Sequence, residues 1–252
     1  MRFFLEISYH GALFYGWQIQ NKNISVQETI EKCLSFLLKK NIKIIGAGRT
    51  DAGVHAIQMF AHFDFNQNLL LIDKNIKFKL NYFLPLNIKI KNIFSVKNKI
   101  HARFNVLSRV YEYRIFLEKN PFYLDTSWQW LYKKKIKIKI LNKGAKLLKK
   151  YKDYSSFCKK KSNNKTYICH IFYAKWILKK KKLFFYIEAN RFLRNMVRSI
   201  VGTLIELGIK KITLKDFIQI IEAKNRHLAG ISAPAKGLFL IKINYPINIY
   251  LF

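Results

Sequence analysis

A glycine-rich loop, GAGRTDAGVHA at residues 46–56, is the feature that most constrains how this chain can fold. Its glycines lack a Cβ atom, so the backbone can turn tightly and approach a ligand closely. Within the loop, Arg49 stands two residues before Asp51 and offers a forked donor to a phosphate or a base edge. Such turns also occur as structural elements in which the aspartate caps the next segment, so the loop alone leaves both interpretations open.

The hydrophobic pattern around this loop predicts a ferredoxin-like first half, residues 1–104. A capping box, Ser25–Glu28, precedes an apolar stripe at helical spacing, which predicts a helix to about Lys40. A second helix is predicted at 73–83, before Pro85. Alternating or β-branched runs predict strands at 2–9, 42–47, 57–65 and 88–97. The resulting order is β-α-β-β-α-β, the ferredoxin-like arrangement.

The second half, residues 105–252, has a similar mixture of strand and helix patterns. Strands are predicted at 109–118, 166–178, 183–190 and 238–245, and helices at 141–152, 191–207 and 213–224. The alternation of lysine and isoleucine at 133–140 predicts an edge strand or a linker, and 159–165 a basic loop. We therefore expect an α+β fold of two ferredoxin-like, RRM-like halves that share an extended antiparallel sheet flanked by helices, with a basic central cleft.

The charge of the chain points to a polyanionic partner. The formal net charge is +33, which is typical of proteins that bind nucleic acid. Lysine outnumbers arginine 38 to 9, and residues with A/T-rich codons are abundant, so part of the lysine excess reflects genome composition. Arginine is then the more informative base, because it is retained where a planar fork is needed. The arginines cluster at 49, 103–114 and 191–198 and could converge on one cleft or lie scattered on the surface.

Two of these arginine clusters have a regular spacing. On a strand, Arg109, Tyr111 and Tyr113 share one face, from which a tyrosine could stack on an extruded base or simply pack the sheet. On a helix, spacing i, i+3 and i+7 predicts one basic face, formed by Arg191, Arg194 and Arg198.

The remaining composition favours a cytoplasmic protein without a metal or nucleotide cofactor. The cysteines at 33, 158 and 169 are too few and too widely spaced for a disulfide framework, which suits a reducing compartment. Neither a signal peptide nor a membrane span is expected. His55 and His62 lie near Asp51, but no second carboxylate follows before Asp64, so we expect no metal site. A P-loop is also not expected, since no Gly-Lys-Ser/Thr follows the glycines.

In combination, these motifs resemble the bacterial tRNA pseudouridine synthase A (TruA) family. The resemblance runs in order from residue 5 to residue 246. It is carried by the glycine-rich loop together with YHGALFYGWQIQ (9–20), LNYFLP (80–85), HARF (101–104), RVYEY (109–113), FLRNMVRSIVG (192–202) and GLFL (237–240). It implies isomerisation of uridine to pseudouridine at positions 38, 39 and 40 of the tRNA anticodon stem and loop, by a cofactor-free homodimer.

The resemblance also implies roles for individual residues. Asp51 matches the catalytic aspartate and Tyr111 the tyrosine that contacts the target base. Arg198 matches the arginine that pairs with the aspartate, and Arg49 the loop arginine that fills space near the flipped nucleotide. Leu238 matches an apolar residue that packs on the base.

The chain departs from the family pattern at two places. His10 stands where an aspartate is usual, and Gln58-Met59 replace the usual Gly-Gln, which affects strand packing or tRNA placement. The residues by themselves also leave other functions open. The alternatives to a pseudouridine synthase are a non-catalytic RNA-binding protein that uses the same cleft, or a metal-dependent nuclease. Excess chelator would inactivate a nuclease but not a pseudouridine synthase, whose reaction needs no redox step and no energy source.

Overall fold

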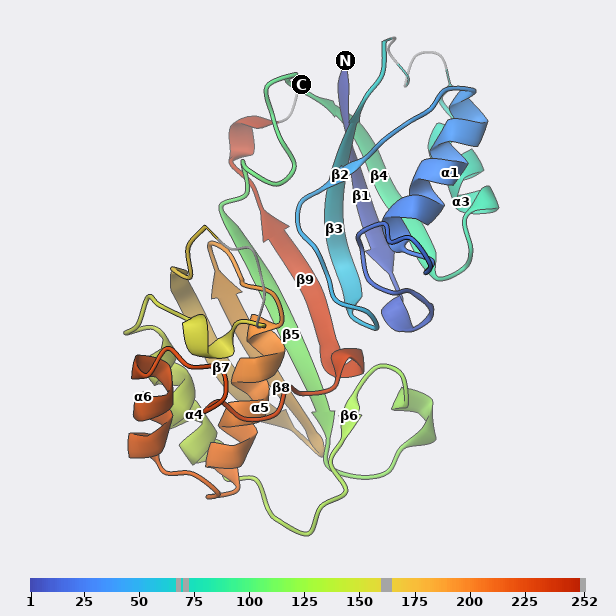
Figure 1. Ribbon diagram of the computed structural model, residues 1–252. Helices are drawn as coiled ribbons and strands as arrows, with labels where there is room; N and C mark the ends of the chain where they lie inside the picture. Colours follow the sequence, from blue (N-terminus) through green and yellow to red (C-terminus); the bar gives the residue numbers. More distant parts are fainter. Residues whose placement is uncertain (67–68, 70–72, 160–164, 250–252) are drawn as a thin grey trace. The chain divides into compact units, whose positions relative to one another are not determined.

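The computed structural model describes residues 1–66, 69, 73–159 and 165–249 (Figure 1). The chain divides into two compact units. Unit 1 comprises Met1–Leu107 with Leu240–Phe252, and unit 2 comprises Ser108–Phe239. Strands in both units pair mainly antiparallel and helices accompany them, so the predicted α+β class is confirmed. No helix in the described ranges is long and apolar enough to span a membrane.

Unit 1 is built on the strand order β4-β1-β3-β9. The central strand β1 (Arg2–Tyr9) runs antiparallel to β3 (His55–Asp64) and to β4 (Ile88–Val96), and the short β2 (Ile45–Gly46) pairs with the same stretch of β3. The last strand, β9 (Leu238–Asn244), enters unit 1 at Leu240. Helices α1 (Val26–Leu38) and α3 (Ile76–Phe83) contact each other beside these strands (Figure 1).

The core of unit 1 explains why β1 is buried along most of its length. Successive residues of a strand point to opposite faces of the sheet. Phe3 stacks on Phe63 with ring centroids 5.6 Å apart. The ring of Phe4 is tilted against that of Phe60 and makes a T-shaped contact with that of Tyr245. Both faces of β1 are therefore covered by aromatic side chains, which suits a strand rich in phenylalanine.

Unit 2 has the strand order β5-β8-β7. It contains β5 (Ser108–Phe116), β7 (Ile171–Lys179) and β8 (Lys182–Ala189), all antiparallel, with the short β6 (Trp128–Gln129) parallel to β5. Helix α4 (Ile138–Leu148) packs on β7 and also contacts α5 (Met196–Gly208) and α6 (Leu214–Glu222) (Figure 1). Short 3-10 turns complete both units at Gly11–Leu13, Pro121–Tyr123, Ser155–Phe157, Ala235–Gly237 and Ile247–Ile249.

Two predictions for unit 2 need correction. The lysine–isoleucine alternation at 133–140 forms no strand: residues 133–137 are the linker that the pattern also allowed, and from Ile138 onward the chain forms α4, which buries Leu141, Ala145 and Leu148 on one helical face. The helix predicted from residue 191 begins only at Met196, because Asn195 adopts a left-handed backbone conformation with φ of 64°. Arg191 and Arg194 therefore precede the helix and do not share one of its faces with Arg198.

Other boundaries in the first half differ by a few residues. The predicted helix at 73–83 starts at Ile76 because the side chain of Asp73 accepts from the amide of Asn75 and forms a turn. The predicted strand at 42–47 shortens to β2, because side chains of α1 hold residues 42–44. In the second half, most of the predicted basic loop at 159–165 lies outside the described residues.

Candidate active site

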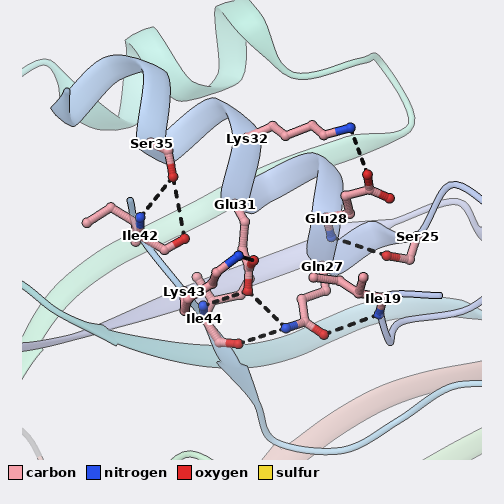
Figure 2. A network of polar contacts seen from close by, with 10 residues as sticks. All are labelled: Ile19, Ser25, Gln27, Glu28, Glu31, Lys32, Ser35, Ile42, Lys43 and Ile44. Carbon is pink, nitrogen blue, oxygen red and sulfur yellow. Dashed lines mark hydrogen bonds and ion pairs between the residues drawn. The ribbon is translucent and has the colours of Figure 1, made fainter. Parts of the chain in front are cut away.

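A buried polar network on α1 positions the segment that leads into the glycine-rich loop (Figure 2). The carboxylate of Glu31, 4% exposed, accepts from the amide of Ile44 at 2.9 Å, from Gln27 Nε2 at 2.9 Å and from Lys43 Nζ at 3.2 Å. Gln27 also donates to the carbonyl of Ile44 at 3.1 Å and accepts from the amide of Ile19 at 3.4 Å. One helix thus holds the strand entering the loop and the neighbouring segment after Trp17.

The residue before Asp51 is fixed by contacts from two other segments. The hydroxyl of the buried Thr50 lies 2.8 Å from the hydroxyl of Tyr9, and its carbonyl accepts from the amide of Trp17 at 3.2 Å. Gly16, with φ of 91°, passes so close that a Cβ atom there would lie 2.5 Å from the Thr50 carbonyl oxygen. Only glycine fits this crossing without strain.

The residues after Asp51 are held as firmly. The amide of Val54 donates to the Asp51 carbonyl at 3.2 Å, and Gly53 takes φ of 75° and donates to the carbonyl of Phe14. Gly11 packs directly on Val54, since a Cβ at residue 11 would lie 2.0 Å from the carbonyl oxygen of Val54. Asp51 itself is half-buried. A carboxylate on a turn fixed from both sides is suited to act as a nucleophile or a base at a defined position.

A cavity of about 190 Å³ lies beside this loop within unit 1. The residues that line it include Gly46 and Gly48 from the loop, together with Gln18, Gln27, Arg49 and Arg103. Arg49 donates from Nε to Gln18 Oε1 at 3.1 Å. The residues that form this wall include no aspartate and no glutamate.

Arg103 reaches the cavity from a turn held by two histidines. The amide of Arg103 donates to His101 Nδ1 at 3.0 Å, and the amide of Ala102 donates to His62 Nδ1 at 3.2 Å. Burial, assisted by the positive charges of Arg2 and His101, lowers the pKa of His62 to about 4. Neutral His62 keeps a lone pair on Nδ1, so it anchors the turn from within the sheet.

In unit 2, the structure separates the two tyrosines of β5. Tyr113 is fully buried; it donates to the carbonyl of Pro234 at 2.8 Å, and a Cβ at Gly237 would lie 2.6 Å from its ring. Burial raises the pKa of Tyr113 well above its usual value. Tyr111 instead meets Phe192 edge to face, with ring centroids 5.1 Å apart. Tyr113 therefore packs the unit.

Arg198 and Leu238 both lie near the loop that precedes β9. Arg198, in the first turn of α5, donates from Nε to the carbonyl of Ala233 at 2.7 Å, and the Ala233 amide donates back to the Arg198 carbonyl at 3.0 Å. Leu238 begins β9 and is 6% exposed. Of the five predicted site residues, Asp51 and Arg49 lie in one loop of unit 1. Tyr111, Arg198 and Leu238 lie in unit 2, on β5, α5 and β9.

Comparison with known proteins agrees with these features. A family model described as tRNA pseudouridine synthase matches residues 145–246. The chain is 45% identical over 245 residues to tRNA pseudouridine synthase A of Azobacteroides pseudotrichonymphae, covering 97% of each chain. Identity to the Bacteroides fragilis enzyme of that name is 43% (99% and 98% covered), and to the Borrelia garinii enzyme 41% (95% and 97% covered). The chain belongs to the tRNA pseudouridine synthase A family. The predicted resemblance and the predicted enzyme class, an isomerase, are confirmed.

Residues at both positions where the chain departs from the pattern of the tRNA pseudouridine synthase A family, His10 and Gln58, make contacts with neighbouring segments of unit 1. The ring of His10 lies 4.5 Å from that of His55, whose Nδ1 accepts from the Gly11 amide at 3.0 Å. Gln58 donates to the buried carboxylate of Glu6 at 2.9 Å and accepts from the amide of Ile243 at 3.0 Å. Gln58 thus joins β1, β3 and β9 within unit 1.

Gln27 and Glu31 are not among the site residues predicted from the sequence motifs. Their spacing of four residues places them on one face of α1, beside the buried Ile30 and Leu34. Two polar side chains amid an apolar stripe are the signal that could have identified them, because buried polar groups need hydrogen-bond partners.

Proposed function

We propose that this chain converts uridine to pseudouridine at positions 38, 39 and 40 in the anticodon stem and loop of tRNAs, with Asp51 as the catalytic residue. The observation that carries the proposal is the glycine-rich loop, in which Thr50, Gly53 and Val54 are each held by hydrogen bonds around Asp51. Family membership supports the reaction class, and the net charge of +33 supports a tRNA substrate.

The reaction needs a carboxylate but no redox partner. The N1–C1′ bond of the target uridine breaks, the uracil turns, and a C5–C1′ bond forms; C5 loses its proton and N1 gains one, so the product is an isomer. Asp51 acts either as a nucleophile at C1′ or as a base at the ribose. Because C1′ of a stacked nucleotide is shielded, the target base leaves its stack before the reaction.

We further propose that Arg49, Tyr111, Arg198 and Leu238 bind the substrate. Tyr111 offers an aromatic ring to the extruded uracil, and base–aromatic stacking is a common mode of single-stranded RNA recognition. The ring of Tyr111 makes a T-shaped contact with the ring of Phe192. Arg198 is anchored to Ala233 through Nε, so its guanidinium has a defined orientation. The enzyme works in the cytoplasm as a homodimer, without a cofactor.

The test is tritium release from C5-labelled uridine in a tRNA transcript. Asp51→Asn should release no tritium yet bind tRNA within about tenfold of the native protein, or about 1.4 kcal/mol, because removing an anion does not weaken attraction for phosphate. The matched control is Asp125→Asn, the same change at an exposed aspartate, which should leave turnover unchanged. Turnover by Asp51→Asn would assign the chemistry to another residue, and loss of native activity in excess chelator would indicate a metal-dependent reaction instead.

A further inference from the structure

The 3-10 turn Gly11–Leu13 packs against the turn that carries Asp51. A Cβ atom at residue 11 would lie 2.0 Å from the carbonyl oxygen of Val54, so the two backbones are in direct contact there. The amide of Val54 in turn donates to the carbonyl of Asp51 at 3.2 Å. On the other side, the amide of Gly53 donates to the carbonyl of Phe14 at 3.2 Å. The position of Asp51 therefore depends on where the 3-10 turn is fixed.

A side chain of β3 fixes this 3-10 turn at the point where the sheet ends. Strands β1 and β3 pair as far as Tyr9 and Ala56. Beyond that pair the chain leaves β1, and the buried Gly11 begins the 3-10 turn. A buried amide that leaves a sheet needs a new acceptor. Nδ1 of His55, the first residue of β3, supplies it at 3.0 Å.

The imidazole of His55 is itself held in one orientation. It is 1% exposed, and the ring of His10 lies against it with centroids 4.5 Å apart. Because Nδ1 accepts a hydrogen bond it carries no proton, so the proton of the neutral ring is on Nε2. A buried ring in a defined orientation sets both the length and the direction of its bond to the Gly11 amide.

We propose that His55 is a positioning residue for Asp51, which acts through the amide of Gly11. This inference rests on the proposed function, since it takes Asp51 as the catalytic residue. The connection is short: His55 holds Gly11, Gly11 contacts Val54, and Val54 closes the turn of Asp51. Reaction at C1′ requires the carboxylate to be accurately placed, because a displacement of about 1 Å can cost on the order of 100-fold in rate.

Two amide side chains of different reach test the proposal. In His55→Asn the side-chain oxygen can occupy the position of Nδ1, whereas in His55→Gln it extends toward that of Nε2 and does not meet the Gly11 amide. Tritium release from C5-labelled tRNA, measured over a range of tRNA concentrations, gives kcat and KM. His55→Gln and His55→Leu should lower kcat about 100-fold with little change in KM, and His55→Asn should recover about tenfold of that loss. If the ring only fills space, glutamine is the better replacement, because it is closer to histidine in volume.

Asn81→Leu is the matched control. Oδ1 of Asn81 accepts from the amide of Ile90 at 2.8 Å, so this change also removes the side-chain acceptor of a strand amide in unit 1. Ile90 lies on β4, which β1 separates from β3. Asn81→Leu should lower the free energy of unfolding in urea and leave kcat unchanged.

The proposal is overturned if His55→Gln, folded by circular dichroism at the assay temperature, turns over as fast as His55→Asn. It is also overturned if folded His55→Leu keeps the kcat of Asn81→Leu. Should His55→Leu not fold, the comparison of the two amides decides. Failure of the proposed function gives a different result, because the native protein would then release no tritium or Asp51→Asn would still release it.

Discussion

Acidification should loosen the turn that carries Arg103 through protonation of His62. This histidine is 2% exposed, and its Nδ1 accepts from the amide of Ala102 at 3.2 Å. Protonation would turn the acceptor into a donor and place a charge in the core of unit 1. The pKa of His62 is about 4 in the folded protein and 6.5 in an unfolded chain, so folding favours the neutral form.

The sign and size of the effect follow from this difference. Because the unfolded state binds the proton more tightly, the stabilisation is fully present above pH 6.5 and is lost as the pH falls toward 4. Each unit in this window corresponds to about 1.36 kcal/mol. Between pH 7 and pH 5 the free energy of unfolding should therefore decrease by about 2 kcal/mol through His62 alone. The half-buried His101, whose pKa burial also lowers, acts in the same direction.

Urea unfolding at pH 7, 6 and 5, monitored by circular dichroism, measures the effect. His62→Asn places an amide oxygen near the position of Nδ1, so it keeps an acceptor that does not titrate. Its decrease from pH 7 to pH 5 should be about 2 kcal/mol smaller than that of the native protein. His227→Asn, at an exposed histidine, should behave as the native protein does. A His62 pKa above 6 by NMR, or an unchanged pH dependence in His62→Asn, would refute the reasoning.

Further predictions concern the α1 network and unit 2. Glu31→Ala removes the acceptor of three donors and should lower the free energy of unfolding by about 2–4 kcal/mol in urea, with Glu31→Gln costing less; equal stability of the two variants would contradict this. Arg198→Lys should reduce tritium release far more than Lys236→Ala, because an ammonium does not reproduce the fork; near-native turnover would remove Arg198 from the site. Tyr111→Leu should weaken stem-loop binding by ~1–3 kcal/mol, whereas Tyr111→Phe should bind normally and, if the hydroxyl helps at C5, release little tritium. Native behaviour of both Tyr111 variants would mean that the ring only packs the sheet.

Elements whose pattern is local could be predicted well. The strand at 2–9 coincides with β1, and the Ser25 side chain accepts from the amide of Glu28 at the start of α1 as the capping pattern indicates. Alternation and capping depend on neighbours within a few residues, so the sequence displays them directly. The first residues of α4 alternate isoleucine and lysine, a pattern that also fits an edge strand, so the sequence predicts the start of this helix three residues too late.

The sequence by itself determined the family, the reaction class and the glycine-rich loop with its aspartate, because these depend on residues in a specific order. It could not separate Tyr111 from Tyr113, since both lie on one face of a strand and both are buried; only the packing of Tyr113 against Pro234 and Gly237 distinguishes them. Nor could it place Arg103 beside Arg49, residues 54 positions apart in the sequence that share a wall of one cavity. Contacts between segments far apart in the chain leave no periodic pattern in the sequence, because they form only when the folded sheet brings these segments together. Tertiary structure alone decided those contacts, and with them which polar groups are held in place and which can meet a substrate.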